Sequence, residues 1–264
     1  MASSNAAKSA SRREQLRAAR EREAAAARRK RITVVAVAVV VAAVLVAVIA
    51  MAAGGVFGKR SGGSGATSTV VSVRPPHASP GDKGVFSADN VNDSAPVLTV
   101  IDDFQCPICH TYETVFGPVF ESLAKKGETR LEYRTRYFLD INLKNDSSVR
   151  AARAAAIADT FGKYQEYHDT VFSNQPAKEG TGYTDDQLRN AFPQAAGITG
   201  DDLAKFQSSY DKGEMNAFVD AVDRQAQADG YNGTPTFLAN DRKIDMPRKT
   251  NPTEDDIMKL VRGV

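Results

Sequence analysis

The sequence predicts one α/β domain that contains an inserted group of helices and follows a single membrane-spanning helix. Three observations lead to this prediction. An uncharged apolar run occupies residues 32–53. Beyond it, β-rich and helical patterns follow in the order strand, helix, strand, a block of helices, then strand, strand, helix. After the run and a linker, residues 85–264 form a stretch of roughly 180 residues, which is long enough to bury one hydrophobic core.

The apolar run has the length of a membrane span. Its 22 residues would extend about 33 Å as a helix, against ~30 Å for the hydrocarbon core of a bilayer. Residues 1–31 carry ten Lys or Arg against three Glu, so the N-terminus is expected in the cytoplasm and the domain outside. Ala50-Met51-Ala52 also fits a signal-peptidase site, but the run exceeds the roughly 7–15 residues of a cleaved signal. We predict an uncleaved signal anchor and a single-pass cell-membrane protein.

The charge of the chain is segregated, which bears on its partners. The overall charge is +2, yet the residues after position 31 carry 24 basic against 29 acidic side chains. A basic segment beside a membrane span is typical of contact with anionic lipid, so we expect no nucleic-acid partner. Residues 54–84 begin with a Gly/Ser-rich stretch and are predicted to form a flexible linker. The folded domain is expected over residues 85–264.

The first part of this domain predicts a βαβ unit. Ala95–Phe104 is a β-rich run typical of a buried strand, and Thr129–Phe138 alternates apolar and charged residues as a second strand. Between them, Pro107 occupies a first helical position, where its missing N–H costs nothing. The helix that follows has apolar residues at the i, i+3/i+4 spacing: Tyr112, Val115, Phe116, Val119, Phe120 and Leu123. A connection of this length predicts parallel strands.

A block of helices is expected over residues 146–230. Its segments end repeatedly at Gly or before Pro, and Asp146 or Ser147 is a suitable first cap. Four aromatic residues are expected in the core of this block: Tyr164, Tyr167, Phe172 and Phe206. His168 is expected to be a packed helix residue.

The last segments predict two strands and a helix. Thr234–Ala239 and Arg242–Met246 are short strand-like runs joined at Asn240-Asp241, residue types that tolerate a tight hairpin turn. A final helix begins at Thr253, with Asp256 three residues on as in a capping box. Without the helical block, the order is βαβ–ββα, which is the plan of a thioredoxin fold.

The only two cysteines, Cys106 and Cys109, stand in the sequence C-P-I-C-H. This pattern fits a c-type haem attachment site, a redox dithiol or half of a zinc site. The chain has no second C-x-x-C and only three histidines. A structural zinc needs a set of four ligands, so no metal site is predicted. Haem c calls for a haem-enclosing, mostly helical fold, so it stays the less favoured alternative. A structural disulfide closing so small a loop would contribute only about 2 kcal/mol.

The redox dithiol fits the predicted elements best. A cysteine at a helix N-terminus faces free N–H groups and the positive end of the dipole, which stabilise its thiolate. This effect, up to about 2 kcal/mol, would lower the pKa of Cys106 from ~8.5 toward ~7. One helical turn keeps Cys109 within reach of Cys106. Pro107, Ile108 and His110 adjoin the sulfurs and are expected to modulate them, with His110 an ordinary residue of the first helical turn.

A second motif, "NGTPTF", lies 126 residues after the first. Proline is poorly tolerated inside a strand, and Thr234-Pro235 begins one. A cis bond here would turn the backbone of Thr234 outward, where it could pair with an extended peptide beside the dithiol. Thr234 and Pro235 are therefore predicted substrate-binding residues. The alternative is a trans proline that merely starts a strand.

Four segments together resemble a known family: "VLTVIDDFQCPICHTYETVF", "GKYQEYHDTVFSNQ", "YTDDQLRNAFPQAAGI" and "GYNGTPTFLAN". They resemble the DsbA-like thiol–disulfide oxidoreductases, especially the membrane-anchored actinobacterial forms. The resemblance implies a thioredoxin fold with a helical insertion, a nucleophilic Cys106 and Cys109 as its partner. It implies no cofactor besides the Cys106–Cys109 disulfide, cysteine-containing exported proteins as substrates, and a membrane reoxidising partner of DsbB or VKOR type.

The sequence departs from that family at three places. Many relatives have a buried acid where this chain has Val100. Asp102 and Asp103 are nearer to the dithiol; they are expected either to assist proton transfer or to be solvated or capping residues at the strand end. Ile108 stands where strongly oxidising relatives have histidine. Thr234 before the proline resembles isomerases and reductases as much as oxidases. We expect a disulfide oxidase, with isomerase or reductase as the alternative.

Overall fold

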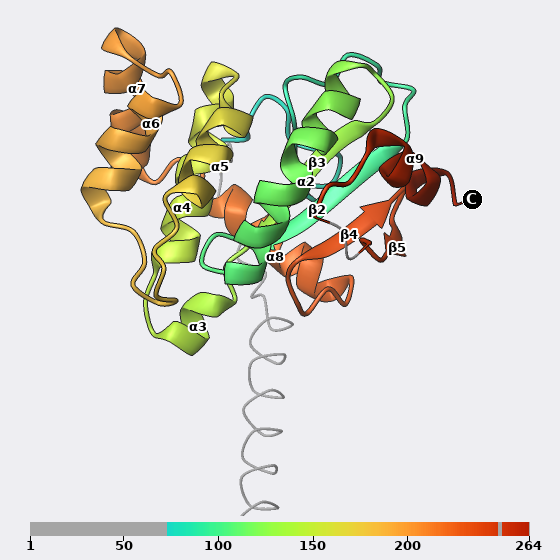
Figure 1. Cartoon of the computed structure of the whole chain (residues 1–264). Coiled ribbons are helices and arrows are strands. Elements are labelled where there is room, and N and C mark those ends of the chain that lie inside the picture. The colour runs from blue at the N-terminus through green and yellow to red at the C-terminus, as the bar shows by residue number, and fades with distance from the viewer. Residues whose placement is uncertain (1–72, 248–249, 264) are drawn as a thin grey trace, which may run out of the picture. The chain divides into compact units, whose positions relative to one another are not determined.

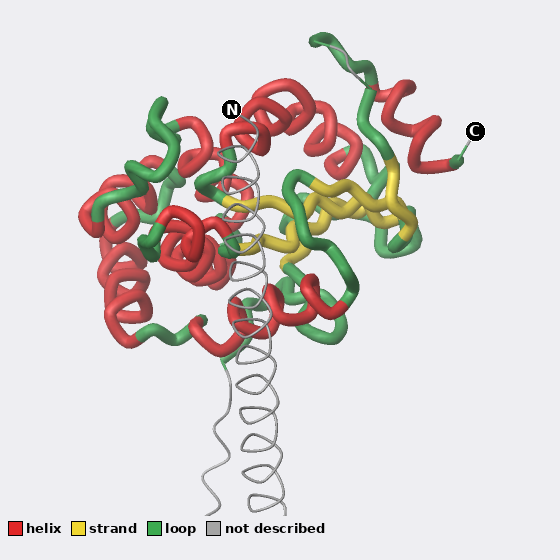
Figure 2. The backbone as a smooth tube through the Cα atoms, turned by 90° about the horizontal axis from the view of Figure 1, so that it is seen from below, coloured by secondary structure: helices red, strands yellow, loops and turns green. Residues whose placement is uncertain are grey.

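The computed structural model describes residues 73–247 and 250–263. Its strands form one mixed sheet in the order β1-β3-β2-β4-β5 (Figures 1 and 2). β2 and β3 are parallel, while the other neighbouring pairs are antiparallel. The strands are β1 (Val85–Phe86), β2 (Val97–Asp103), β3 (Arg130–Arg136), β4 (Thr236–Ala239) and β5 (Arg242–Ile244).

Helices cover both faces of this sheet. The helices are α2 (Pro107–Lys125), α3 (Leu139–Leu143), α4 (Ser147–Ala158), η1 (Asp159–Phe161), α5 (Tyr164–Ser173), η2 (Gln187–Ala191), α6 (Phe192–Ala195), α7 (Gly200–Lys212), α8 (Asn216–Ala228) and α9 (Glu254–Arg262). Figures 1 and 2 show α2 and α9 on one side of the sheet, α8 on the other, and α4 to α7 gathered beside it. The α/β fold with an inserted helical group is as predicted.

The predicted βαβ unit is confirmed. β2 pairs with β3 in parallel from Val97 opposite Arg130 to Asp103 opposite Arg136, and α2 connects them. α2 begins at Pro107, with Cys106 as its N-cap. Its apolar face is buried at Cys109, Phe116, Phe120, Leu123 and Ala124. This helix therefore fixes the dithiol at the end of the central parallel pair.

The segment before β2 contributes more to the domain than the sequence predicts. β1 was not foreseen, because two residues are too few for a detectable alternation. Residues 73–84, assigned above to the linker, contact the domain: the backbone N–H and Nδ1 of His77 both lie 2.8 Å from Asp159 carboxylate oxygens. No helix among the described residues is long and apolar enough to cross a membrane. The predicted anchor at residues 32–53 lies outside them.

The inserted helices have an aromatic core of their own. Tyr164, Tyr167, Phe172 and Phe206 are all buried, as predicted. Asp146 is the N-cap of α4, but its side chain makes no capping hydrogen bond and instead accepts one from Arg150 Nε at 2.8 Å.

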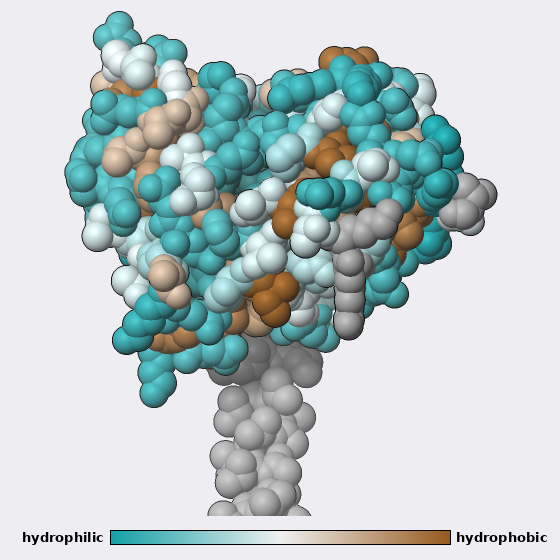
Figure 3. All heavy atoms as spheres, in the orientation of Figure 1, coloured by the Kyte–Doolittle hydropathy of each residue, from teal (hydrophilic) through white to brown (hydrophobic). Residues whose placement is uncertain are grey.

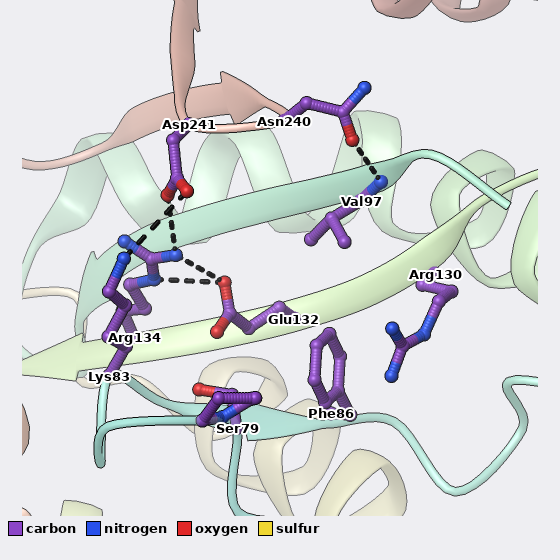
Figure 4. Close-up of a pocket in the computed structure, with 10 residues that line it drawn as sticks. Ser79, Lys83, Phe86, Val97, Arg130, Glu132, Arg134, Asn240 and Asp241 are labelled. Carbon is purple, nitrogen blue, oxygen red and sulfur yellow. Dashed lines mark hydrogen bonds and ion pairs between the residues drawn. The ribbon is translucent and has the colours of Figure 1, made fainter. Parts of the chain in front are cut away.

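The C-terminal hairpin and helix follow their sequence signals. Asn240 and Asp241 both have positive φ, at 48° and 62°, as a type I′ turn requires. Asn240 Oδ1 also accepts a hydrogen bond from the backbone N–H of Val97, which ties the turn to β2 (Figure 4). At α9, Thr253 and Asp256 form the predicted capping box.

A polar pocket of about 320 Å³ lies near this turn. Figure 4 shows its ion pairs, in which Arg134 contacts both Glu132 and Asp241, and Lys83 also contacts Asp241. Arg134 and Glu132 are almost completely buried. Because these cations are paired with carboxylates, the cluster joins β3 to the hairpin turn and has a structural role.

Candidate active site

The dithiol lies where β2 gives way to α2. The backbone N–H of Cys106 donates to the carbonyl of Asp103 at 2.9 Å, and Cys106 Sγ accepts a hydrogen bond from the N–H of Cys109 at 3.3 Å. Both cysteines are free thiols and both are buried. Beside them, Ile108 is 58% exposed. The molecule thus presents an apolar side chain next to a reduced dithiol.

The second motif meets the first in space. The Thr234–Pro235 peptide bond is cis. The Cys106 thiol donates to the carbonyl oxygen of Thr234 over 3.7 Å. A groove of about 410 Å³ runs along residues 229–236 and Lys243. Thr234, whose carbonyl oxygen contacts Cys106, is therefore also part of the wall of this open groove.

The surroundings of Cys106 favour its thiolate. The pKa of Cys106 is lowered to about 6, chiefly because the Cys109 thiol donates a hydrogen bond to its sulfur. The N–H groups of Cys109 and Ile108 and the Thr234 side chain act in the same direction, while burial opposes them. The direction agrees with the helix N-terminus argument, and the hydrogen bonds account for the further decrease.

Cys109 is affected in the opposite direction. Burial, followed by the hydrogen bond to the Cys106 sulfur, raises the pKa of Cys109 well above its usual value. A cavity of about 10 Å³ adjoins Cys109, which is room for about one water molecule. Val100, Asp102 and Pro235 also line it. One sulfur is therefore prepared as a nucleophile and the other stays protonated.

The acids near the dithiol are buried, so the expectation of solvated acids is wrong. Asp102 is 1% exposed and Asp103 is 0% exposed. Asp103 instead accepts hydrogen bonds from Ser148 Oγ and, as a capping residue does, from the backbone N–H groups of Gln105 and Leu139. Burial nevertheless raises the pKa of Asp103 to about 7. Asp103 thus ties the β2–α2 loop to α3 and α4.

Asp102 pairs with His168, for which the sequence predicted a packed position but no partner. Its Oδ2 lies 2.7 Å from His168 Nε2, and the histidine is completely buried among aromatic rings, as its expected packed position requires. Burial lowers the pKa of His168, but Asp102, Asp169 and Glu113 together outweigh that effect and raise it to about 10. A lone helical histidine gives no signal of such a partner 66 residues away.

Two further residues from the helical region position the dithiol loop. Gln175 Nε2 donates to the carbonyl oxygens of Phe104 and Cys106, at 2.8 and 3.1 Å. Tyr183 Oη donates to the same Phe104 oxygen at 2.7 Å. Neither residue was predicted, because a loop glutamine or tyrosine carries no local motif. The insertion therefore helps to hold the nucleophile.

The remaining predicted residues lie close by. Pro107 and His110 belong to the first turn of α2; His110 is partly exposed, and its Nδ1 is buried without a hydrogen-bond partner. The face of the molecule seen in Figure 3 is mostly hydrophilic, with small separate hydrophobic areas. The haem alternative calls for a mostly helical enclosure, which the five-stranded sheet beside the dithiol does not supply.

The fold and the site together define a thiol–disulfide oxidoreductase: a thioredoxin-type sheet, a C-x-x-C dithiol at a helix start, and an X-Pro loop against it. Residues 92–261 match the family model described as thioredoxin. The chain belongs to the thioredoxin family. No curated protein matches it.

Three similar solved structures are of DsbA-like proteins. MdbA, a thiol-disulfide oxidoreductase from Corynebacterium diphtheriae, is 18% identical, and the match covers 71% of this chain and 92% of that one with a TM-score of 0.55. Reduced DsbA from Mycobacterium tuberculosis is 24% identical, with 69% of this chain and 93% of that one covered and a TM-score of 0.55. The reduced disulfide bond oxidoreductase DsbG from the same organism is 26% identical, with 71% of this chain and 90% of that one covered and a TM-score of 0.56. These likenesses fit the DsbA-like family expected from the sequence.

Proposed function

We propose that this protein is a membrane-tethered disulfide oxidase that acts on cysteine pairs of exported proteins outside the cytoplasm. The observation that carries the proposal is the low pKa of Cys106, about 6, beside the Thr234–Pro235 loop and its open groove. A stabilised thiolate favours the dithiol state of the protein, and its disulfide is then the stronger oxidant. The anchor expected at residues 32–53 supports the location.

The reaction consists of two thiol–disulfide exchanges. A client thiolate attacks Cys106 Sγ, the Cys106–Cys109 bond breaks, and Cys109 leaves with the electron pair and takes up a proton. The second client thiolate then attacks the client sulfur of the mixed disulfide, and Cys106 leaves as a thiolate. The client dithiol becomes a disulfide, two electrons pass to the protein, and the second client proton goes to solvent.

The two cysteines are suited to these different roles. Departure of Cys106 is favoured by its low pKa. Cys109, buried and with a raised pKa, resists attack by solvent thiols and takes up the proton. The groove beside Thr234 is suited to an extended client segment that pairs with the backbone at this position. A membrane partner of DsbB or VKOR type would withdraw the two electrons and restore the disulfide.

The test is oxidation of a reduced model substrate by the full-length chain. Cys106→Ser should abolish the reaction, because no Cys106–Cys109 disulfide remains for a client thiolate to attack. Given a client disulfide instead, Cys109→Ser should accumulate mixed disulfides with the client. The Cys106 thiolate displaces one client sulfur as a thiolate, and no Cys109 thiol is left to release the other; the product is detectable by mass spectrometry and reversible with reductant. The proposal fails if the Cys106→Ser protein oxidises the substrate at the parent rate.

Isomerase or reductase activity is the second candidate, favoured by one observation. A threonine, Thr234, stands before the cis-proline, and its carbonyl oxygen contacts the Cys106 thiol at 3.7 Å. A scrambled-disulfide substrate distinguishes the two activities: an isomerase restores its native pairing, whereas an oxidase acts only on free cysteine pairs.

A further inference from the structure

A group of metal-binding residue types lies behind the dithiol, between α2 and α5. Its centre is His168, whose side chain is completely buried. Nε2 of the ring is occupied by the hydrogen bond to Asp102. Nδ1 is also buried but has no hydrogen-bond partner, and Asp169 Oδ1 lies 3.5 Å away. The ring is thus fixed from one side, and on the other its Nδ1 makes no hydrogen bond and lies near the Asp169 carboxylate.

Two carboxylates lie beside the His168 ring. Glu113 comes from α2 and Asp169 from α5, and one ligand atom from each lies within 4.8 Å of the others and of the His168 ring. Gly117 makes room for Glu113, because a Cβ at that position would collide with Glu113 Oε1. A glycine inside a helix costs about 1 kcal/mol relative to alanine. Here it allows the carboxylate to lie along α2.

The group is accessible from solvent. A pocket of about 290 Å³ is lined by Glu113 and Asp169, together with His110, Glu121 and Phe172. Both carboxylate residues are only half-buried, whereas His168 lies behind them. An ion could therefore reach the nitrogen without unfolding of the domain.

The charges around His168 are unbalanced toward the negative. Asp102, Glu113 and Asp169 surround a single imidazole, so three carboxylates face at most one positive charge. Such partly buried acids are stabilised by pairing or by a metal ion. A divalent cation would supply the missing charge at the position where Nδ1 points.

We propose that His168 Nδ1, Glu113 and Asp169 form a binding site for Zn²⁺, with a fourth position open to the pocket. One imidazole and two carboxylates are suitable Zn²⁺ ligands, and three protein ligands with one open position are typical of an accessible zinc site. The hydrogen bond from Nε2–H to Asp102 is the outer contact that metal-binding histidines usually make. The ring then binds as neutral imidazole, and Zn²⁺ replaces a proton on Nδ1.

The geometry requires only side-chain movement. With metal–ligand distances of about 2.0–2.2 Å, ligand atoms around a tetrahedral ion lie about 3.4 Å apart. His168 Nδ1 and Asp169 Oδ1 already lie 3.5 Å apart. One carboxylate oxygen of Glu113 lies within 4.8 Å of a ligand atom of each of the other two residues, so Glu113 has to move inward by rotation of its long side chain.

The test is calorimetric titration of ZnCl₂ into the full-length chain with its cysteines oxidised to the disulfide. Oxidation prevents the Cys106 and Cys109 thiolates from binding the ion. We expect one Zn²⁺ per chain. Glu113→Gln and Asp169→Asn, near-isosteric changes at half-buried positions that should leave the fold intact, should each weaken binding at least ~10-fold. Asp102→Asn should weaken it by about 10- to 100-fold, as for other outer contacts.

Glu121→Gln is the matched control. It removes a carboxylate from the wall of the same pocket but from outside the ligand group, so binding should stay within about twofold of the parent. The proposal is overturned if the oxidised parent binds no Zn²⁺, or if Glu113→Gln and Asp169→Asn bind it as tightly as the parent. Equal weakening by Glu121→Gln would also overturn it, because diffuse negative charge would then explain the binding.

Discussion

The most informative perturbation is at Cys109, because its thiol makes the largest contribution to the low pKa of Cys106. Cys109→Ala removes this hydrogen bond and leaves the backbone N–H at 3.3 Å in place. Cys109→Ser keeps a donor at the same position. The two variants therefore separate the side-chain hydrogen bond from the helix N-terminus.

The size of the effect follows from the strength of such a bond. A hydrogen bond to a charged group contributes about 1.5–3 kcal/mol, which corresponds to about 1–2 pKa units. We expect the pKa of Cys106 to rise from about 6 to about 7–8 in Cys109→Ala. In Cys109→Ser it should stay within about one unit of the parent value.

The assay is the rate of alkylation of Cys106 by iodoacetamide as a function of pH. Only the thiolate reacts, and Cys109 in the parent is buried and protonated, so the rate reports Cys106. The rate should fall as pH decreases through about 6 in the parent. A parent inflection above about 8, or equal inflections in Cys109→Ala and Cys109→Ser, would refute this reasoning.

Three changes test the structural account. Arg134→Met should destabilise the fold by about 3–5 kcal/mol in urea unfolding, because it leaves buried Glu132 without its cation; a loss below about 1 kcal/mol would contradict the importance of this pair. Tyr183→Phe should cost only about 1 kcal/mol, since Gln175 still donates to the Phe104 oxygen, and a much larger loss would show that the glutamine does not compensate. Thr253→Ala should lower stability to thermal unfolding by about 1 kcal/mol without affecting alkylation of Cys106; a changed alkylation rate would contradict the separation of α9 from the dithiol.

The low pKa also gives the dithiol form a definite pH dependence. A thiol whose pKa is depressed from 9.0 to about 6 favours the dithiol form increasingly as pH rises between these values, and the preference is lost below about 6. At pH 7 it amounts to at most about 1.4 kcal/mol, or about 30 mV for the two-electron couple. The activated thiolate thus accounts for part of an oxidising potential, and further stabilisation of the dithiol must supply the rest.

The sequence predicted the fold well where local patterns are strong. The α2 periodicity, the Asn240-Asp241 turn and the Thr253 capping box each depend on residues close together in the chain, and all three are present. β1 was missed because two residues carry no period. The contacts of His77 with Asp159 were missed because they join segments 82 residues apart.

The candidate site was predictable only in its motif residues. Cys106 and Cys109 form a recognisable pattern, and Thr234-Pro235 is unusual at the start of a strand. By contrast, Gln175, Tyr183 and His168 affect the site through single hydrogen bonds from the helical region. Such contacts depend on how helices pack against the sheet, and no local pattern in the sequence specifies them. The burial of Asp102 likewise follows from α5 covering the end of β2.

The measurement that tests the central claim most directly is the reduction potential of the Cys106–Cys109 couple in the full-length chain. It is obtained by equilibrating the protein with glutathione buffers of known ratio and quantifying the dithiol fraction. A disulfide oxidase with an activated Cys106 should have a potential near about −120 mV. A potential near about −270 mV, the value of a reductant such as thioredoxin, would contradict the proposed direction of electron flow.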